Sequence, residues 1–213
     1  EDKRGKNLRL VNLRASIDNG GILHAAAAVN SYDYGRIGKA DDYKHDKGKY
    51  QQNFLSAYTE LKVDSFVVKG LEAENIAMQH EFKMDYALTR SGDYLLLNYN
   101  LFTGFEKNPF IAENRFSNID FGTRQGLVFN EIIAVPGLET ESIPKNIRLV
   151  TPDNSMAFIR EIKRVENEIQ IGLRVDINKS EYIPAEYHLV KDFYKKMFEA
   201  INEPIVFKAK KEL

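Results

Sequence analysis

The stretch that decides the fold is Ile169-Gln170-Ile171-Gly172-Leu173-Arg174-Val175-Asp176-Ile177. Apolar residues occupy every second position, and the residues between them are polar or small. Because side chains alternate between the two faces of a β-strand, this pattern predicts a strand with one buried face. Asn167 separates the stretch from a similar run, Met156 to Val165, so we expect a hairpin that turns there.

Strand-like runs continue towards both ends of the chain. Leu8 to Ile17 and Ile22 to Tyr34 flank Asp18-Asn19-Gly20-Gly21, where glycine can supply the positive φ of a tight turn, and this predicts an opening hairpin. The other predicted strands are Val63–Leu71, His80–Leu88, Tyr94–Leu101, Leu127–Val135, Ile147–Thr151 and Ile205–Phe207.

Two segments have helical instead of strand periodicity. Apolar residues recur at three- and four-residue spacing from Tyr50 to Leu61, which predicts a helix at about residues 47–62. Pro184 opens the second segment, at a position where its missing N–H costs nothing, and predicts a helix at about 184–202. Its apolar stripe consists of Tyr187, Val190, Tyr194, Met197 and Ile201.

Residues 102–124 are irregular but rich in aromatic side chains. We expect the phenylalanines of this loop to be buried, since each buried ring contributes a few kcal/mol that a solvated loop would forgo. The polar residues Asn108, Arg115 and Asp120 are interleaved with them. We therefore predict that these three form a structural network of hydrogen bonds and ion pairs that holds the loop.

These elements predict a mainly β fold with a minor α+β character. No regular alternation of strands and helices indicates a parallel sheet, so we expect two antiparallel β-sandwich-like units, each with about one helix. Residues 1–119 form the first predicted domain, which contains the helix at about 47–62. Residues 120–213 form the second, which contains the C-terminal helix.

Composition excludes several classes of function. The 213 residues carry a net charge of -1, which is no electrostatic footprint for nucleic acid. No apolar run approaches the roughly 18 residues that span a bilayer. The chain has no cysteine, so disulfides, cysteine zinc sites, iron–sulfur clusters and cysteine nucleophiles are excluded within it.

A search for catalytic or metal-binding patterns leaves no strong candidate. The acidic cluster Asp33, Asp41, Asp42, His45 and Asp46 lacks the ligand spacing of an EF-hand. The pairs Glu72–Glu74 and Glu139–Glu141 are sequence neighbours, whereas glycoside hydrolysis needs carboxyls that face each other across a cleft. We expect no catalytic residue, no metal and no cofactor. A cleft that gathers one histidine and two carboxylates would favour a hydrolase instead.

Exposed aromatic side chains suggest an alternative, a binding module. Tyr32, Tyr34 and Tyr43 lie close together in sequence, and tyrosine rings on a β-sandwich are typical of a glycan- or peptide-binding surface. The chain has no tryptophan, the usual strongest stacking residue, and the tyrosines can equally pack on the following helix.

Short motifs in a fixed order resemble the C-terminal region of bacterial secreted transglutaminase-like proteins. The resemblance covers about residues 94–210. The motifs are Leu101-Phe102, Asn108-Pro109-Phe110, Arg115, Asp120-Phe121, Pro152-Asp153-Asn154, Ile177-Asn178-Lys179, Pro184-Ala185-Glu186-Tyr187, Phe193 and Pro204-Ile205-Val206-Phe207-Lys208.

In that family, β domains of unknown function flank a papain-like catalytic core. The cysteine, histidine and aspartate of the family belong to the core, and no part of this chain matches it. The resemblance therefore implies a non-catalytic C-terminal accessory module, which stabilises the core or shapes substrate access. It also implies an extracytoplasmic parent, in the periplasm or at the cell surface, whose catalytic core is the partner of this chain. The substrate of such a parent is left open.

Overall fold

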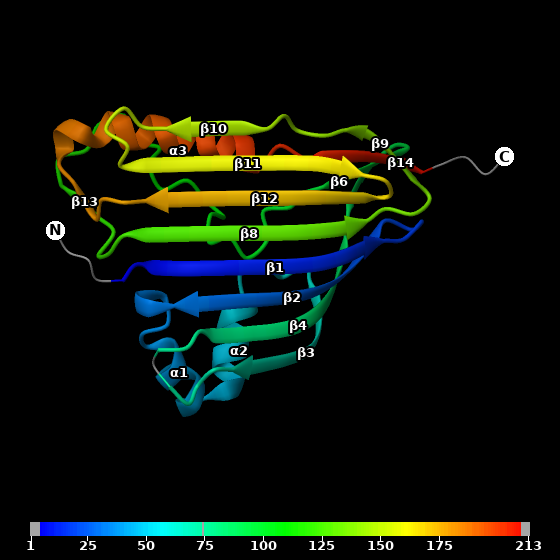
Figure 1. The fold of residues 1–213 in the computed structure, drawn as a ribbon, viewed down its shortest axis with the longest axis horizontal. Helices are drawn as coiled ribbons and strands as arrows, with labels where there is room; N and C mark the ends of the chain where they lie inside the picture. Colours follow the sequence, from blue (N-terminus) through cyan, green and yellow to red (C-terminus); the bar gives the residue numbers. More distant parts are fainter. Residues whose placement is uncertain (1–4, 74, 210–213) are drawn as a thin grey trace.

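A computed structural model describes residues 5–73 and 75–209, so Glu74 of the predicted Glu72–Glu74 pair lies outside the described residues (Figure 1). The largest element is an eight-stranded sheet in the order β10-β11-β12-β8-β1-β2-β4-β3. Its strands are β1 Asn7–Ile17, β2 Ile22–Tyr32, β3 Lys62–Lys69, β4 Met78–Ala87, β8 Gln125–Ala134, β10 Ile147–Val150, β11 Met156–Val165 and β12 Glu168–Ile177.

A second layer covers one face of this sheet. It contains a four-stranded sheet, a two-stranded sheet and the C-terminal helix α3, Tyr187–Ile201, which contacts β10 and β11. The strands of the smaller sheets are β5 Thr89–Ser91, β6 Tyr94–Leu97, β7 Ile119–Asp120, β9 Leu138–Ser142, β13 Glu181–Tyr182 and β14 Ile205–Ala209. Figure 1 shows α3 and β14 behind the large sheet, whose front face carries no helix or strand of the described chain.

The core lies between these two layers. Alternate residues of β1, β2, β8 and β12 point inward, as the fully buried Val11, Leu23, Phe129 and Ile169 illustrate. The predicted mainly β class is confirmed, and the strand predicted from the Ile169–Ile177 alternation is β12. None of the described helices has the length and apolar character needed to cross a bilayer.

The two segments on either side of residue 120 share the large sheet, which differs from two purely antiparallel units. β1 pairs with β8 in parallel, from Asn7 with Gln125 to Ser16 with Ala134. Alternation predicts which face of a strand is buried, but it carries no information on the direction of the neighbouring strand. Where a domain boundary of this chain lies stays a prediction; the sheet itself continues across residue 120.

The predicted helix at 47–62 is wrong in its extent. The first segment contains two short helices, α1 Lys39–His45 and α2 Lys47–Leu55, and a 3-10 turn η1 at Asp33–Gly35. Asp46 caps α2, since its carboxylate accepts a hydrogen bond of 2.9 Å from the Lys49 N–H. Ser56 then ends the helix by donating to the Asn53 carbonyl at 2.7 Å.

The C-terminal helix matches its prediction closely. A 3-10 turn η2 at Pro184–Glu186 precedes α3. The predicted stripe is buried, with Val190, Met197 and Ile201 fully inaccessible to solvent. Phe193 and Phe198 are buried beside it, so α3 contributes a broad apolar face to the core.

The expectation that the loop phenylalanines are all buried is wrong for one of them. Phe102 and Phe110 are buried, and Phe105 and Phe121 are half-buried against the core. Phe110 packs edge-to-face on Tyr194 of α3, with ring centroids 4.6 Å apart. Phe116 in contrast is 94% exposed, because it lies at an outward part of the loop that the core does not reach.

Arg160 of β11 joins the two layers. Its side chain is 3% exposed, and all three guanidinium nitrogens donate hydrogen bonds. The acceptors are the carbonyl of Ala200 at the end of α3, the Tyr99 hydroxyl, the Lys145 carbonyl and the Glu203 carboxylate. A cation at a helix C-terminus also interacts favourably with the helix dipole.

Glu131 of β8 is a buried acid. It points into the core from between Leu13 of β1 and Ile171 of β12, the residues opposite it in the sheet. Neither carboxylate oxygen has a hydrogen-bond partner among the described residues, and burial raises the pKa of Glu131 to about 8. The side chain is therefore mainly protonated at neutral pH.

We predict that Arg160→Lys lowers the free energy of unfolding by about 3 kcal/mol. Lysine cannot reach all four acceptors, and buried acceptors would lose their donors. Arg174→Lys is the matched control, because Arg174 is 60% exposed and pairs with Asp176 at the surface. Urea unfolding measures both, and an equal small change in the two variants would contradict the role of Arg160.

We also predict that Glu131→Gln removes a pH dependence of stability. The unfolded chain releases the Glu131 proton above its ordinary pKa, whereas the folded chain retains it up to about pH 8, so wild-type stability falls as pH rises through this window. The loss reaches roughly 3 kcal/mol at pH 7.

Thermal unfolding of the wild type and Glu131→Gln between pH 6.5 and 8 tests this, because the other groups that titrate there, such as His24 and Lys39, are common to both proteins and cancel in the comparison. The exposed Glu161→Gln on β11 is the control and should retain the wild-type slope. Parallel curves for wild type and Glu131→Gln would show that Glu131 is ionised in the folded protein.

Candidate functional site

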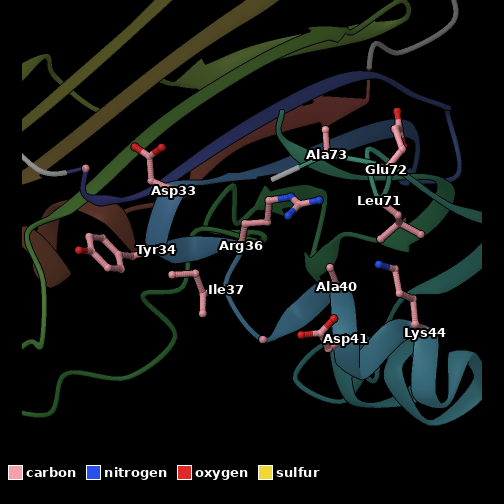
Figure 2. Close-up of a pocket in the computed structure, with 12 residues that line it drawn as sticks. Asp33, Tyr34, Arg36, Ile37, Ala40, Asp41, Lys44, Leu71, Glu72 and Ala73 are labelled. Carbon is pink, nitrogen blue, oxygen red and sulfur yellow. The ribbon is translucent and has the colours of Figure 1, made fainter. Parts of the chain in front are cut away.

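A cavity of about 750 Å³ lies beside the N-terminal end of β1. Its walls come from η1, from the turn and first residues of α1, and from Leu71, Glu72 and Ala73 after β3 (Figure 2). We call it the Arg36 pocket. Its volume falls within the usual range of small-molecule sites.

Two glycines shape this pocket. Gly38 has a φ of +78° and lets the chain turn from η1 into α1. Gly70 has a φ of +74°, and a Cβ atom there would lie 2.0 Å from the Ala77 carbonyl oxygen. Only glycine fits this tight connection between β3 and β4, and the Gly70 carbonyl accepts a hydrogen bond from Arg36, which lines the pocket.

Arg36 is the central side chain of the pocket. It is only 7% exposed, and its Nη2 donates to the Gly70 carbonyl at 2.8 Å. Nε is buried with no partner, and Nη1 has no hydrogen-bond partner in the described chain. In Figure 2 its guanidinium reaches from η1 towards the Leu71–Ala73 segment. The group is thus held in place by one bond and has donor capacity left over.

Both positively and negatively charged side chains line the pocket beside Arg36. Lys44 of α1 extends towards Leu71, and the carboxylates of Asp33, Asp41 and Glu72 also line the cavity (Figure 2). Within the described residues, none of these four side chains takes part in an ion pair. The pocket therefore presents both hydrogen-bond donors and acceptors that are not engaged by one another.

Polar contacts of Lys39 and Tyr50 join α1 and α2 to the large sheet. Lys39 donates to the Ser31 hydroxyl at 3.1 Å, and burial, with a contribution from the charge of Arg9, lowers the pKa of Lys39 to about 8. His80 is fully buried between the Tyr50 hydroxyl at 2.7 Å and the Val29 carbonyl at 3.2 Å.

Burial, aided by Lys39 and Arg9, lowers the pKa of His80 to about 4. Its ring also stacks on Phe54 with centroids 4.4 Å apart. With this low pKa His80 is neutral at pH 7, and its contacts with Tyr50 and Phe54 join α2 to the large sheet.

One histidine does gather two carboxylates. His24 lies 2.7 Å from Asp85 through Nδ1 and 3.4 Å from Asp18 through Nε2. The hydrogen bond to Asp85, followed by that to Asp18, raises the pKa of His24. The three side chains are about half exposed and line none of the larger cavities of the described chain. Both carboxylates favour the protonated ring, and each ring nitrogen faces one of them, so His24 presents no nitrogen to a substrate.

The three predicted binding tyrosines do not form one platform. Tyr34 lines the Arg36 pocket and is 39% exposed. Tyr32 is half-buried at the end of β2, and Tyr43 packs edge-to-face on Tyr50, with ring centroids 5.5 Å apart. Of the three, Tyr34 is the one that lines the Arg36 pocket, and whether it binds a ligand stays a prediction.

The predicted structural residues act separately. Asn108 accepts from the Phe110 N–H at 2.9 Å, and Asp120 accepts from the Gly122 N–H at 2.7 Å. Arg115 donates to the Ser117 and Asn118 carbonyls at 3.1 and 3.4 Å. No hydrogen bond or ion pair of the described chain joins the three to one another. Short polar side chains find backbone partners two residues away, so the expected network is replaced by local turns.

The acidic cluster and the edge carboxylates are all exposed. No group of three metal-ligating side chains is assembled within the described residues. Asp46 is the α2 cap described above, and Asp41 lines the Arg36 pocket. Glu139 and Glu141 are exposed on β9, an edge strand of the four-stranded sheet.

Sequence reasoning missed Arg36. It belongs to Gly35-Arg36-Ile37-Gly38-Lys39, a segment that resembles a phosphate loop only superficially. What makes Arg36 unusual is its burial and its bond to Gly70, 34 positions away. A contact between residues this far apart cannot be predicted from a local sequence pattern.

We predict that Arg115→Ala lowers the free energy of unfolding by about 1 kcal/mol, since two loop carbonyls lose their donor. Arg14→Ala is the control, because Arg14 is exposed on the open face of the sheet. Thermal unfolding should show a decrease of about 2–4 °C for Arg115→Ala alone. An unchanged midpoint would mean that Arg115 does not hold the loop.

Comparison with known proteins places the second half of the chain in a family. The family model DUF3858, described as "Domain of Unknown Function with solved-structure structure", matches residues 93–207, more than half of the chain. The match begins at β6 and ends in β14, so it includes the Phe116 loop and excludes the Arg36 pocket. No curated protein matches the chain in sequence.

One similar solved structure is described as "a putative protease from Parabacteroides distasonis". It is 14% identical, with a TM-score of 0.46, and the likeness covers 54% of this chain and 23% of that one. The chain thus spans less than a quarter of that protein, and a likeness at this level carries no argument about activity. The family model alone is decisive: this chain belongs to the DUF3858 family of domains of unknown function.

Proposed function

We propose that this chain is a non-catalytic accessory module of a longer, secreted transglutaminase-like polypeptide. In this role it packs against the catalytic core and stabilises it or shapes access of the substrate. The resemblance described above and the DUF3858 match cover nearly the same residues, which supports an origin in such a polypeptide. An extracytoplasmic location is part of the same proposal.

The observation that carries the proposal is an apolar surface around Phe116. Phe116 is 94% exposed and Ile111 is 79% exposed, whereas the rest of the loop packs on the core. Ile183, 53% exposed, belongs to the neighbouring segment after β13. The pairing of β7 with β13 places this segment beside the loop. Large apolar side chains that are exposed on neighbouring segments favour protein–protein contacts. We call these three residues the Phe116 surface.

The backbone behind this surface is firmly held. The Tyr187 hydroxyl donates to the Ala112 carbonyl at 2.8 Å, and Asn118 donates to the Glu181 carboxylate at 2.6 Å. Arg115 bridges two carbonyls within the loop. A loop that is ordered before binding loses little conformational entropy on association, so a fixed Phe116 is suited to docking.

The absence of catalysis from this chain is part of the proposal, and two of its four histidines support it. His80 is enclosed by Tyr50 and Val29, and His24 is clamped by two carboxylates. Neither offers an imidazole nitrogen to a substrate. Catalysis by the parent would then rest on residues of its core.

We predict that Phe116→Ser combined with Ile111→Ser destabilises the natural polypeptide that contains this chain, by about 2 kcal/mol, because two buried apolar side chains leave the interface. The same double substitution in the isolated chain should leave its melting temperature unchanged. Thermal unfolding of both proteins measures the difference.

Val165→Ser is the matched control, since Val165 is 42% exposed at the end of β11, away from the Phe116 surface. It should have no effect in either protein. If the double substitution also leaves the natural polypeptide unchanged, or if that polypeptide has no Cys/His/Asp core, the accessory role is wrong.

A further inference from the structure

We propose that the Arg36 pocket is a binding site for a neutral saccharide. This inference is independent of the accessory role, because the pocket lies outside the Phe116 surface and outside the residues matched by DUF3858. It rests on the charges, the apolar rim and the fixed arginine of one cavity.

The charges of the pocket favour a ligand without net charge. Two cations and three carboxylates line it, so an anion meets the three acids and a cation meets Arg36 and Lys44. A hydroxyl group, in contrast, both donates and accepts hydrogen bonds. A polyhydroxylated ring can therefore satisfy carboxylates and guanidinium together, which a singly charged ligand cannot do.

Arg36 gives the pocket a preorganised hydrogen-bond donor. Burial and the 2.8 Å bond to the Gly70 carbonyl fix the guanidinium, whose Nη1 has no partner in the described chain. Figure 2 shows Lys44 and Arg36 both extended towards Leu71, from α1 and from the turn before it. Because the guanidinium is already fixed, binding of a hydroxyl oxygen to it costs little side-chain conformational entropy.

The carboxylates supply the complementary acceptors. Asp33 and Asp41 come from η1 and α1, and Glu72 comes from the segment after β3, so the acceptors flank Arg36 from different elements. A carboxylate has two oxygens and can accept from two neighbouring hydroxyl groups at once. None of the three is consumed by an ion pair in the described chain.

The apolar part of the lining fits the C–H face of a sugar ring. Tyr34 is 39% exposed, and Ile37 beside it is 70% exposed. Both lie on the same side of Arg36 in Figure 2, opposite Lys44. An aromatic ring next to hydrogen-bonding groups gives a site that is apolar on one side and polar on the other, as a pyranose is.

The test is titration of the isotope-labelled chain with maltotriose, cellotriose and chitotriose, followed by amide NMR spectra. We expect one of these trisaccharides to shift the amides of Ile37, Gly38 and Leu71 at millimolar concentration. Triglycine, a zwitterion, is the competing probe. Shifts at these amides with triglycine alone, or with none of the four probes, would overturn the proposal.

Two variants separate the site from chance surface binding. Tyr34→Ala and Glu72→Gln should each weaken the affinity about tenfold. Neither residue takes part in a hydrogen bond or ion pair within the described chain, so both variants should fold, which the NMR spectrum itself reports. Tyr94→Ala is the matched control, since Tyr94 is 38% exposed on β6, in the smaller sheet. Equal affinities for all three variants would place the binding elsewhere and refute the assignment.

Discussion

The parallel ladder between β1 and β8 is the constraint on which the rest of the structure depends. β1 is hydrogen-bonded on its other side to β2, so the opening hairpin and the C-terminal strands form one continuous sheet. Parallel neighbours cannot be joined by a tight turn, and the long segment between β1 and β8 must cross over the sheet. That segment supplies α1, α2 and the aromatic loop of the second layer.

The ladder also explains where the unusual polar groups lie. Glu131 is confined to the core because β8 is flanked on both sides, by β1 and by β12, and its register directs this side chain inward. Arg160 of β11 is equally buried but is satisfied by the end of α3. The buried guanidinium thus has four acceptors, among them the Ala200 carbonyl at the end of α3, whereas the acid is protonated because no donor of the described chain reaches it.

The two candidate surfaces occupy different parts of this architecture. η1 contacts β1, and the Arg36 pocket therefore depends on the N-terminal hairpin. The Phe116 surface depends on β13 and α3, through Glu181 and Tyr187. A module with one polar cavity and one apolar docking surface can bind a ligand and a protein partner without competition between them.

Much of the local structure could be predicted. The strands of the large sheet were predicted from apolar runs and alternation, as β12 illustrates, and α3 was predicted from Pro184 and the spacing of its buried stripe, because burial of one face requires apolar residues at regular spacing. The short strands β5, β7, β9 and β13 of the smaller sheets were not predicted. The extent of the first helical segment could not be predicted in this way. α2 ends at Leu55 although the apolar periodicity continues to Leu61, and Asp46 separates α2 from a further helix, α1. Phe116 was placed in the core because composition alone cannot distinguish a ring that packs from one that faces solvent.

The sequence by itself determined the mainly β class, the strand faces and the lack of thiol chemistry, since these depend on residue type and on spacing along one element. Only the tertiary structure decided the β1–β8 pairing, the burial of Glu131 and the Arg36–Gly70 contact. Each of these joins residues that are far apart in the chain or on separate strands. Local patterns carry no record of such contacts, because the free energy that selects them comes from packing whole layers together.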